Sequence, residues 1–290
     1  MLLDIHTHVI RQHGPPRSYG DDFVTAEEII PMLDRCGIGR AVVLPIVSPE
    51  CQHVMQSVED VLWMAEAYPD RFIPFCNMDP RMLTNDASAG FGYLFDHYRE
   101  VGCKGIGEIT CNLPFGDPTV GNLFAHAQDA GFPLTFHIAT RVGGIYGLAD
   151  ELGLPGLEGA LRKFPKLTFL GHSQAFWSHI SADVTDETWG GYPTGKVTPG
   201  RIVELMRAYP NLCGDLSAGS GCNAVARDPE FGYAFMTEFQ DRLFFGTDIC
   251  QPTNDTPLVP FFNGALESGS ISQEVFEKIG WRNAERLLGV

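Results

Sequence analysis

The sequence of 290 residues predicts a single α/β domain folded as a (β/α)8 barrel. Eight short runs rich in β-branched and aromatic residues recur along it, and corresponding positions in successive runs are 29 to 43 residues apart, about the length of a βαβ repeat. Eight such repeats with right-handed crossovers close into a barrel, which one domain of residues 1–290 can form. The predicted strands cover residues 2–7, 40–46, 72–77, 104–109, 134–138, 167–171, 212–216 and 243–247.

Helix signals occupy the segments between these predicted strands. Thr25 followed by Glu28 has the form of a capping box, and the helix that it begins is expected to stop at Gly37. No glycine-rich phosphate turn follows the first strand, so a barrel is favoured over a doubly wound open sheet. The longest insertion, residues 173–197, follows the sixth strand, and we expect it to be a loop that acts as a lid or pocket wall.

Charge and composition exclude several classes of function. The net charge of −16 argues against nucleic acid or anionic membranes as partners, since both recruit clusters of basic residues. The sequence shows neither a signal-peptide pattern nor an apolar run of about 18 residues, which predicts a cytoplasmic protein with no membrane span. Eight dispersed cysteines without a C-x-x-C pair are expected to be reduced thiols. An enzyme that acts on a small molecule fits this composition.

Histidines and an aspartate fall at the ends of four predicted strands. His6 and His8 are two residues apart on the first strand, so both imidazoles point to the same side. His137, His172 and Asp248 end the fifth, sixth and eighth strands, and barrel active sites lie at this end. Buried ionisable groups need partners, and one divalent cation supplies a partner for all of them. The sequence therefore predicts a metal site made of these five residues.

This arrangement, with G-T-D at Asp248, resembles the amidohydrolase superfamily. The closing residues 281–289, W-R-N-A-E-R-L-L-G, resemble the tail of the branch related to aminocarboxymuconate semialdehyde decarboxylase, and the resemblance extends from residue 4 to residue 289. It implies that His6, His8, His137 and Asp248 bind metal. For His172 it implies either a second metal or a role in catalysis.

Glu108 ends the fourth predicted strand, where binuclear members of the resembled superfamily place a bridging carboxylate or a carbamylated lysine. Glu108 could therefore bridge two metals. The alternatives are a carboxylate that orients a ligand histidine and a glutamate paired with an arginine. One ion and two ions both stay open. Zn²⁺ is the first expectation for the metal, and Mn²⁺ or Fe²⁺ also suits histidine and carboxylate ligands.

The predicted reaction is metal-dependent hydrolysis of an ester, amide or lactone in a small substrate that could carry a carboxylate. A bound cation can lower the pKa of water from 15.7 to about 7. Asp248 could then accept the proton and pass it to the leaving group, while His172 or the metal stabilises the oxyanion. The alternative is nonoxidative decarboxylation of a small carboxylic acid, with His172 as acid or base. A non-catalytic metal-binding barrel would be expected to lack a ligand, and none is missing.

Three residues are candidates for binding substrate. Arg141, four residues after His137, could hold a substrate carboxylate, or it is a surface arginine. Trp177 and Tyr146 could line a pocket that accepts an aromatic ring, although loop aromatics also seal lids and oligomer contacts.

Other polar residues have less defined expectations. Asp215 ends the seventh predicted strand at the same mouth, where it could orient substrate or satisfy a neighbouring loop. His53, His97 and His126 lie away from strand ends and are expected to be ordinary residues. Dimers are common in the resembled superfamily, so a homo-oligomer stays open.

Overall fold

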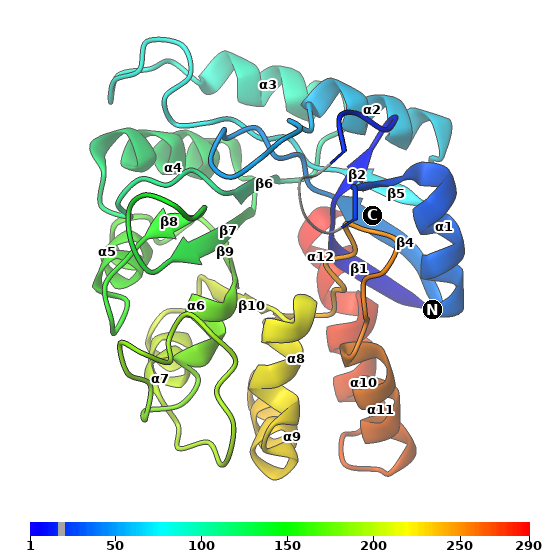
Figure 1. Cartoon of the computed structure of the whole chain (residues 1–290). Coiled ribbons are helices and arrows are strands. Elements are labelled where there is room, and N and C mark those ends of the chain that lie inside the picture. The colour runs from blue at the N-terminus through cyan, green and yellow to red at the C-terminus, as the bar shows by residue number, and fades with distance from the viewer. Residues whose placement is uncertain (17–20) are drawn as a thin grey trace.

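Eight parallel strands form the centre of the protein in a computed structural model that describes residues 1–16 and 21–290 (Figure 1). Each of them overlaps one predicted strand, which confirms the predicted (β/α)8 barrel. Their bounds are β1 (Leu2–Thr7), β4 (Ile38–Val43), β5 (Phe72–Pro74), β6 (Ile106–Ile109), β7 (Leu134–Ala139), β9 (Phe169–His172), β10 (Leu212–Asp215) and β11 (Leu243–Phe244).

The strands form two parallel ladders, ordered β1-β4-β5 and β6-β7-β9-β10-β11. Cys76 and Ile106 form an isolated parallel bridge that joins β5 to β6. At the other junction the amide of Ile5 donates to the carbonyl of Phe245 at 3.0 Å, and the amide of Asp248 donates to the carbonyl of His6 at 2.9 Å. The eighth strand thus returns to the first, and the histidine motif and Asp248 are hydrogen-bonded neighbours.

Helices cover the outside of the strands (Figure 1). The capping box predicted at Thr25 is present, because Glu28 accepts from the Thr25 amide at 2.8 Å. Short strands β2 (Val9–Ile10) and β3 (Val24–Thr25) pair with each other, and β8 (Leu148–Ala149) pairs with β7. The helices are α1 (Ala26–Arg35), α2 (Val58–Ala67), α3 (Gly92–Glu100), α4 (Pro118–Ala130), α5 (Pro155–Lys163), α6 (Gln174–Ser178), α7 (Arg201–Ala208), α8 (Ala218–Ala226), α9 (Pro229–Glu238), α10 (Leu258–Glu267), α11 (Gln273–Glu277), the π-helix η1 (Lys278–Arg282) and α12 (Asn283–Leu288).

The two larger of the three apolar clusters in the described core determine where a site can form. One lies between the strands and the helices, and the other fills the barrel with side chains such as Ile5, Leu44 and Phe75. Ala284 and Leu288 of α12 belong to this inner cluster. Because apolar side chains fill the inside of the barrel, polar groups gather at its carboxyl end. Within the described residues, no helix is both long and apolar enough to cross a membrane.

The insertion after β9 begins with helix α6 and is anchored to the barrel rather than extended as a loop throughout. Ser178 Oγ donates to the carbonyl of Trp189 at 2.8 Å. Further along, the Asp228 carboxylate accepts from the amide of Val197 at 3.0 Å and from Lys196 Nζ at 3.1 Å. The first bond is internal to the insertion, and the other two tie its far end to Asp228, which precedes α9.

The pH dependence of stability is expected to report on His179. Its Nδ1 donates to the carbonyl of Ala175 and its Nε2 accepts from the amide of Gly153, so the folded ring is neutral. Burial lowers the pKa of His179 below its ordinary value of 6.5. The folded chain then binds this proton less readily than the unfolded chain, and the free energy of unfolding falls as the pH drops below 6.5.

Urea unfolding on either side of that pH measures the effect. His179→Gln keeps an acceptor for Gly153 but cannot titrate, so its free energy of unfolding should fall less on acidification than that of the wild type. Equal falls in the two proteins would show that His179 contributes nothing to the pH dependence.

Candidate metal centre

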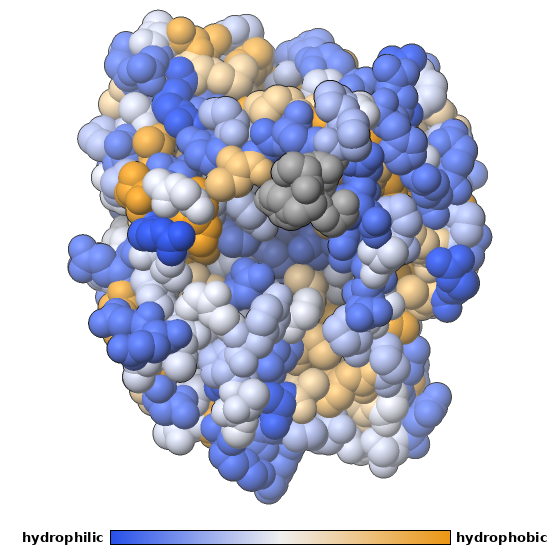
Figure 2. Space-filling model, in the orientation of Figure 1, coloured by the Kyte–Doolittle hydropathy of each residue, from blue (hydrophilic) through white to orange (hydrophobic). Residues whose placement is uncertain are grey.

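The residues predicted to hold metal converge at the carboxyl end of the barrel. β1 places His6 and His8, β6 places Glu108, β7 places His137, β9 places His172, and Asp248 follows β11. A cavity of about 560 Å³ opens there, lined by His8, Glu108, His137, His172 and Asp248. Figure 2 shows this face hollowed near its centre, with mostly hydrophilic residues around the opening. The structure thus brings together all six predicted ligands.

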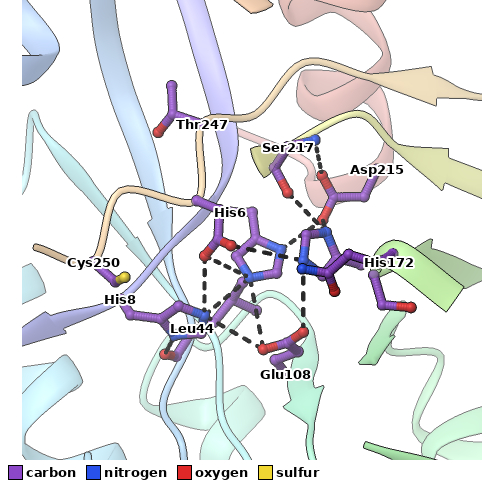
Figure 3. A network of polar contacts seen from close by, with 12 residues as sticks. His6, His8, Leu44, Glu108, His172, Asp215, Ser217, Thr247 and Cys250 are labelled. Atoms are coloured by element: carbon purple, nitrogen blue, oxygen red, sulfur yellow. Dashed lines mark hydrogen bonds and ion pairs between the residues drawn. The ribbon is translucent and has the colours of Figure 1, made fainter. Parts of the chain in front are cut away.

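His6 and His8 face each other through their Nε2 atoms. His6 Nδ1 donates to Asp215 Oδ2 at 2.6 Å, and His8 Nδ1 donates to the carbonyl of Leu44 at 2.8 Å, because neither oxygen can donate. In the neutral rings the two Nε2 lone pairs therefore face each other, 3.0 Å apart (Figure 3). Two lone pairs at that distance repel unless a positive charge lies beside them, and a divalent cation supplies it.

Two carboxylates complete the cluster. Glu108 Oε2 lies 3.4 Å from His8 Nε2 and 3.8 Å from His6 Nε2, while its Oε1 lies 3.9 Å from His172 Nε2. Asp248 Oδ1 lies 3.6 Å from both His6 Nε2 and His8 Nε2, and its Oδ2 lies 3.7 Å from His172 Nε2. Each carboxylate therefore has one oxygen toward the first pair of histidines and one toward His172.

The cluster contains two adjoining sets of three ligands. His6, His8 and Asp248 offer three atoms within 4.8 Å of one another, and Glu108, His137 and His172 offer another three. Glu108 Oε1 and His137 Nδ1 are buried without a hydrogen-bond partner in the described chain, which costs free energy unless a ligand satisfies them. These donors, nitrogen and carboxylate oxygen, fit a divalent transition metal.

The charges of the site suit a cation as well. Burial alone lowers the pKa of His6, but attraction to Asp215 and Asp248 outweighs it and raises this pKa to about 10, so without a metal this ring holds a proton that a bound cation would have to displace. Burial favours neutral Glu108, yet hydrogen bonding to His8 and attraction to His6 hold its pKa well below the usual range. Burial lowers the pKa of His137 to about 4, so it is neutral near pH 7, as a metal ligand must be.

A model of the amidohydrolase family matches residues 4–290. The chain belongs to this family. The match confirms the resemblance that the histidine motif and the G-T-D suggested. Membership also supports a bound divalent metal and a small-molecule substrate, without fixing the identity of either.

Solved structures similar to this amidohydrolase cover nearly all of it. An uncharacterised TIM-barrel protein from Bordetella bronchiseptica is 18% identical, with a TM-score of 0.63, and the match covers 99% of this chain and 98% of that one. A 2,6-dihydroxybenzoate decarboxylase from Rhizobium is 14% identical, with a TM-score of 0.62 and the same two coverages. A 5-carboxyvanillate decarboxylase from Sphingomonas paucimobilis is 16% identical, with a TM-score of 0.57, covering 100% and 99%. At these identities the likeness shows the fold alone. No curated protein matches.

Backbone conformation lets two of the candidate ligands reach the cluster. Asp248 has a φ of 57°, in the left-handed region that aspartate tolerates better than most residues. Gly147 has a φ of +104°, and a Cβ there would lie 2.7 Å from His137 Nδ1. The His137 ring therefore needs glycine at position 147.

The three predicted substrate-binding residues lie in different surroundings. Tyr146 lines the cavity, with its ring 4.5 Å from that of His137. Arg141 is exposed and lines a separate depression beside Phe115 and Asp150. Trp177 is 2% exposed, and its Nε1 donates to the backbone carbonyl of Asp215 at 2.8 Å. Only Tyr146 among the three is in a position to meet a molecule in the cavity.

The cavity also contains residues that the sequence did not single out. Phe23, Ile46 and His53 line it, and the His53 ring stacks on Phe23 with centroids 5.7 Å apart. His53 was expected to be an ordinary residue, because it lies away from the predicted strand ends. Arg81 steadies this loop by donating to Glu50 Oε1 at 2.6 Å. Spacing along the chain gave no signal for these contacts.

Proposed function

We propose that this amidohydrolase is a hydrolase that uses two divalent cations to cleave an ester, amide or lactone bond in a small molecule. The observation that supports it is the orientation of Glu108, whose two oxygens face different histidines. Oε2 is 3.4 Å from His8 and Oε1 is 3.9 Å from His172. A carboxylate that belongs to the second set of three candidate ligands and also faces the histidines of the first is suited to bridging two ions.

The first ion would be held by His6, His8 and Asp248, and the second by His137 and His172, with Glu108 between them. Zn²⁺ is the first candidate, and Mn²⁺ or Fe²⁺ suits the same donors. When bound, such ions lower the pKa of water and polarise a carbonyl group.

Asp248 is the residue best placed to move a proton. Its side chain is 25% exposed, whereas the side chains of His8, Glu108 and His172 are 4% exposed. It can therefore accept a proton from water that enters the cavity and return it to the leaving group, a role that typically contributes about 10²- to 10⁴-fold in rate.

Tyr146 supplies a hydrogen-bond donor beside it. Burial and the nearby carboxylates of Glu108 and Asp248 raise the pKa of Tyr146 well above its ordinary value, so the phenol keeps its proton. A protonated phenol that lines the cavity can donate to a carbonyl oxygen and hold the scissile group in place.

Decarboxylation is the second candidate, because four of the similar structures are decarboxylases of hydroxylated benzoates. In that reaction His172 would act as the acid that protonates the substrate. Among the described residues that line the cavity, none is an arginine or lysine that could hold an additional carboxylate.

Product analysis separates the two reactions. The protein supplied with Zn²⁺ or Mn²⁺ is incubated with a panel of lactones and esters and, in parallel, with hydroxybenzoates, while acid release and carbon dioxide are measured. We expect metal-dependent acid release from a lactone or ester, reduced about 10²- to 10⁴-fold in Asp248→Asn. Carbon dioxide from a hydroxybenzoate, with no lactone or ester cleaved, would assign the protein to the decarboxylases.

A further inference from the structure

Asp215 is a carboxylate at the metal centre that neither proposed reaction uses. It ends β10 and is fully buried. In Figure 3, Asp215 and Ser217 lie on one side of the His6 and His172 rings, and Glu108 lies on the other. Asp215 is also absent from the residues that line the cavity. It therefore contacts the ligand histidines from behind.

One oxygen of Asp215 faces two histidines. Asp215 Oδ2 accepts from His6 Nδ1 at 2.6 Å and lies 3.5 Å from His172 Nδ1. His172 Nδ1 is also 3.0 Å from Ser217 Oγ. His6 belongs to the first set of three ligands and His172 to the second. A single carboxylate thus touches both halves of the centre.

The surroundings hold this carboxylate in place. Its Oδ1 accepts from the Ser217 amide at 3.0 Å, and its backbone carbonyl accepts from Trp177 Nε1 at 2.8 Å. Gly246 lies against it, since a Cβ at that position would be 3.1 Å from Asp215 Oδ1 and 2.8 Å from the Ser217 Cβ. The position of Oδ2 is therefore fixed by covalent geometry and packing before any ligand binds.

We propose that Asp215 is a positioning residue that makes His6 and His172 bind metal through Nε2. By accepting the Nδ1 proton of His6, it leaves only Nε2 with a free lone pair, and it orients that atom toward His8 and Glu108. Asp215 orients the His172 ring in the same way, and Ser217 Oγ is a second contact of His172 Nδ1. Outer partners of this kind typically change metal affinity by about 10- to 100-fold. This role rests on the metal site of the proposed function, and it is independent of the reaction catalysed.

A direct ligand role for Asp215 makes a different prediction. His6, His172 and Asp215 do offer three atoms within 4.8 Å of one another. The histidine atoms nearest Asp215 are the Nδ1 atoms, and that of His6 already donates to Asp215. If Asp215 were a ligand, its loss would remove one ion per chain, whereas a positioning role weakens the binding of each ion and changes its geometry.

The test compares Asp215→Ala, Asp215→Asn and Ser217→Ala with the wild type. Zn²⁺ affinity is measured by competition with a chromophoric chelator, coordination geometry by the visible spectrum of the Co²⁺-loaded protein, and folding by the melting temperature of the metal-free protein. Asp228→Asn is the matched control, because Asp228 is a buried aspartate that accepts from Val197 and Lys196, and it is absent from the cavity lining.

We expect Asp215→Ala to bind Zn²⁺ about 10- to 100-fold more weakly with an altered Co²⁺ spectrum, and Asp215→Asn, which keeps an acceptor, to lose less. Ser217→Ala should lose least, and Asp228→Asn should bind as the wild type does. Wild-type affinity and spectrum in Asp215→Ala would overturn the proposal, as would loss of one whole ion. If Asp215→Ala does not fold, Asp215→Asn is the deciding variant. An unchanged Zn²⁺ affinity and Co²⁺ spectrum in Asp215→Asn would then overturn the proposal. Absence of metal from the wild type would instead contradict the proposed function.

Discussion

His6→Ala is expected to remove bound metal and to abolish turnover. His6 Nε2 lies within 3.0 to 3.8 Å of His8, Asp248 and Glu108. Its loss would therefore leave a cation bound among these residues with one nitrogen ligand fewer. Zn²⁺ binding contributes about 10–16 kcal/mol in small zinc-dependent peptides. Loss of one ligand among several is therefore expected to weaken binding by at least about 10³-fold, equivalent to about 4 kcal/mol.

Chelator competition on the purified variant measures this loss. His97→Ala is the matched control, because His97 is exposed on α3 and should bind metal as the wild type does. Metal bound to His6→Ala with wild-type affinity would show that the cation site lies elsewhere.

Trp177→Ala is expected to lower the free energy of unfolding by about 3–5 kcal/mol, the usual cost of removing a large buried aromatic side chain. The Trp177 ring packs edge-on against Phe176 at 4.9 Å and Phe235 at 6.2 Å, and its Nε1 hydrogen bond to Asp215 would also be lost. Urea unfolding measures the change.

Trp177→Phe is the control, because it keeps an aromatic ring and should lose less stability. A substrate-binding role for Trp177 makes the opposite prediction for its alanine variant. In that case KM would rise while the free energy of unfolding stayed close to that of the wild type.

The sequence predicted the fold, and the convergence of the candidate ligands at one end of it, because both depend on strand ends. Eight runs at regular spacing define the barrel, and the barrel alone brings His6, His137, His172 and Asp248 to one mouth. No side-chain contact had to be known to place them. The family match over residues 4–290 agrees with this prediction.

Distance along the chain from a ligand was a poor guide to the cavity wall. Arg141 follows His137 by four residues but lies on an exposed segment beside a different depression. Trp177 follows His172 by five residues, and α6 directs it against Gly214 of β10. The direction of a side chain after a strand depends on the path of the loop, which no periodic pattern records.

Two other features needed three-dimensional contacts. Phe23 and His53 come from separate loops and meet only in the folded chain. Asp215 was expected at the mouth, to orient substrate or to satisfy a neighbouring loop, whereas it accepts from His6, a contact that joins residues 209 positions apart. Which residue contacts Asp215 depends on how the side chains of β1, β9 and β10 pack together.

The number of metal ions per chain tests the central claim most directly. Elemental analysis is made on protein purified without chelator and reloaded with Zn²⁺, for the wild type and for Glu108→Ala. Because Glu108 belongs to one set of candidate ligands and also faces the other, we expect two ions per chain in the wild type and one in the variant. One ion in both proteins would contradict a bridged pair and would favour decarboxylation over hydrolysis.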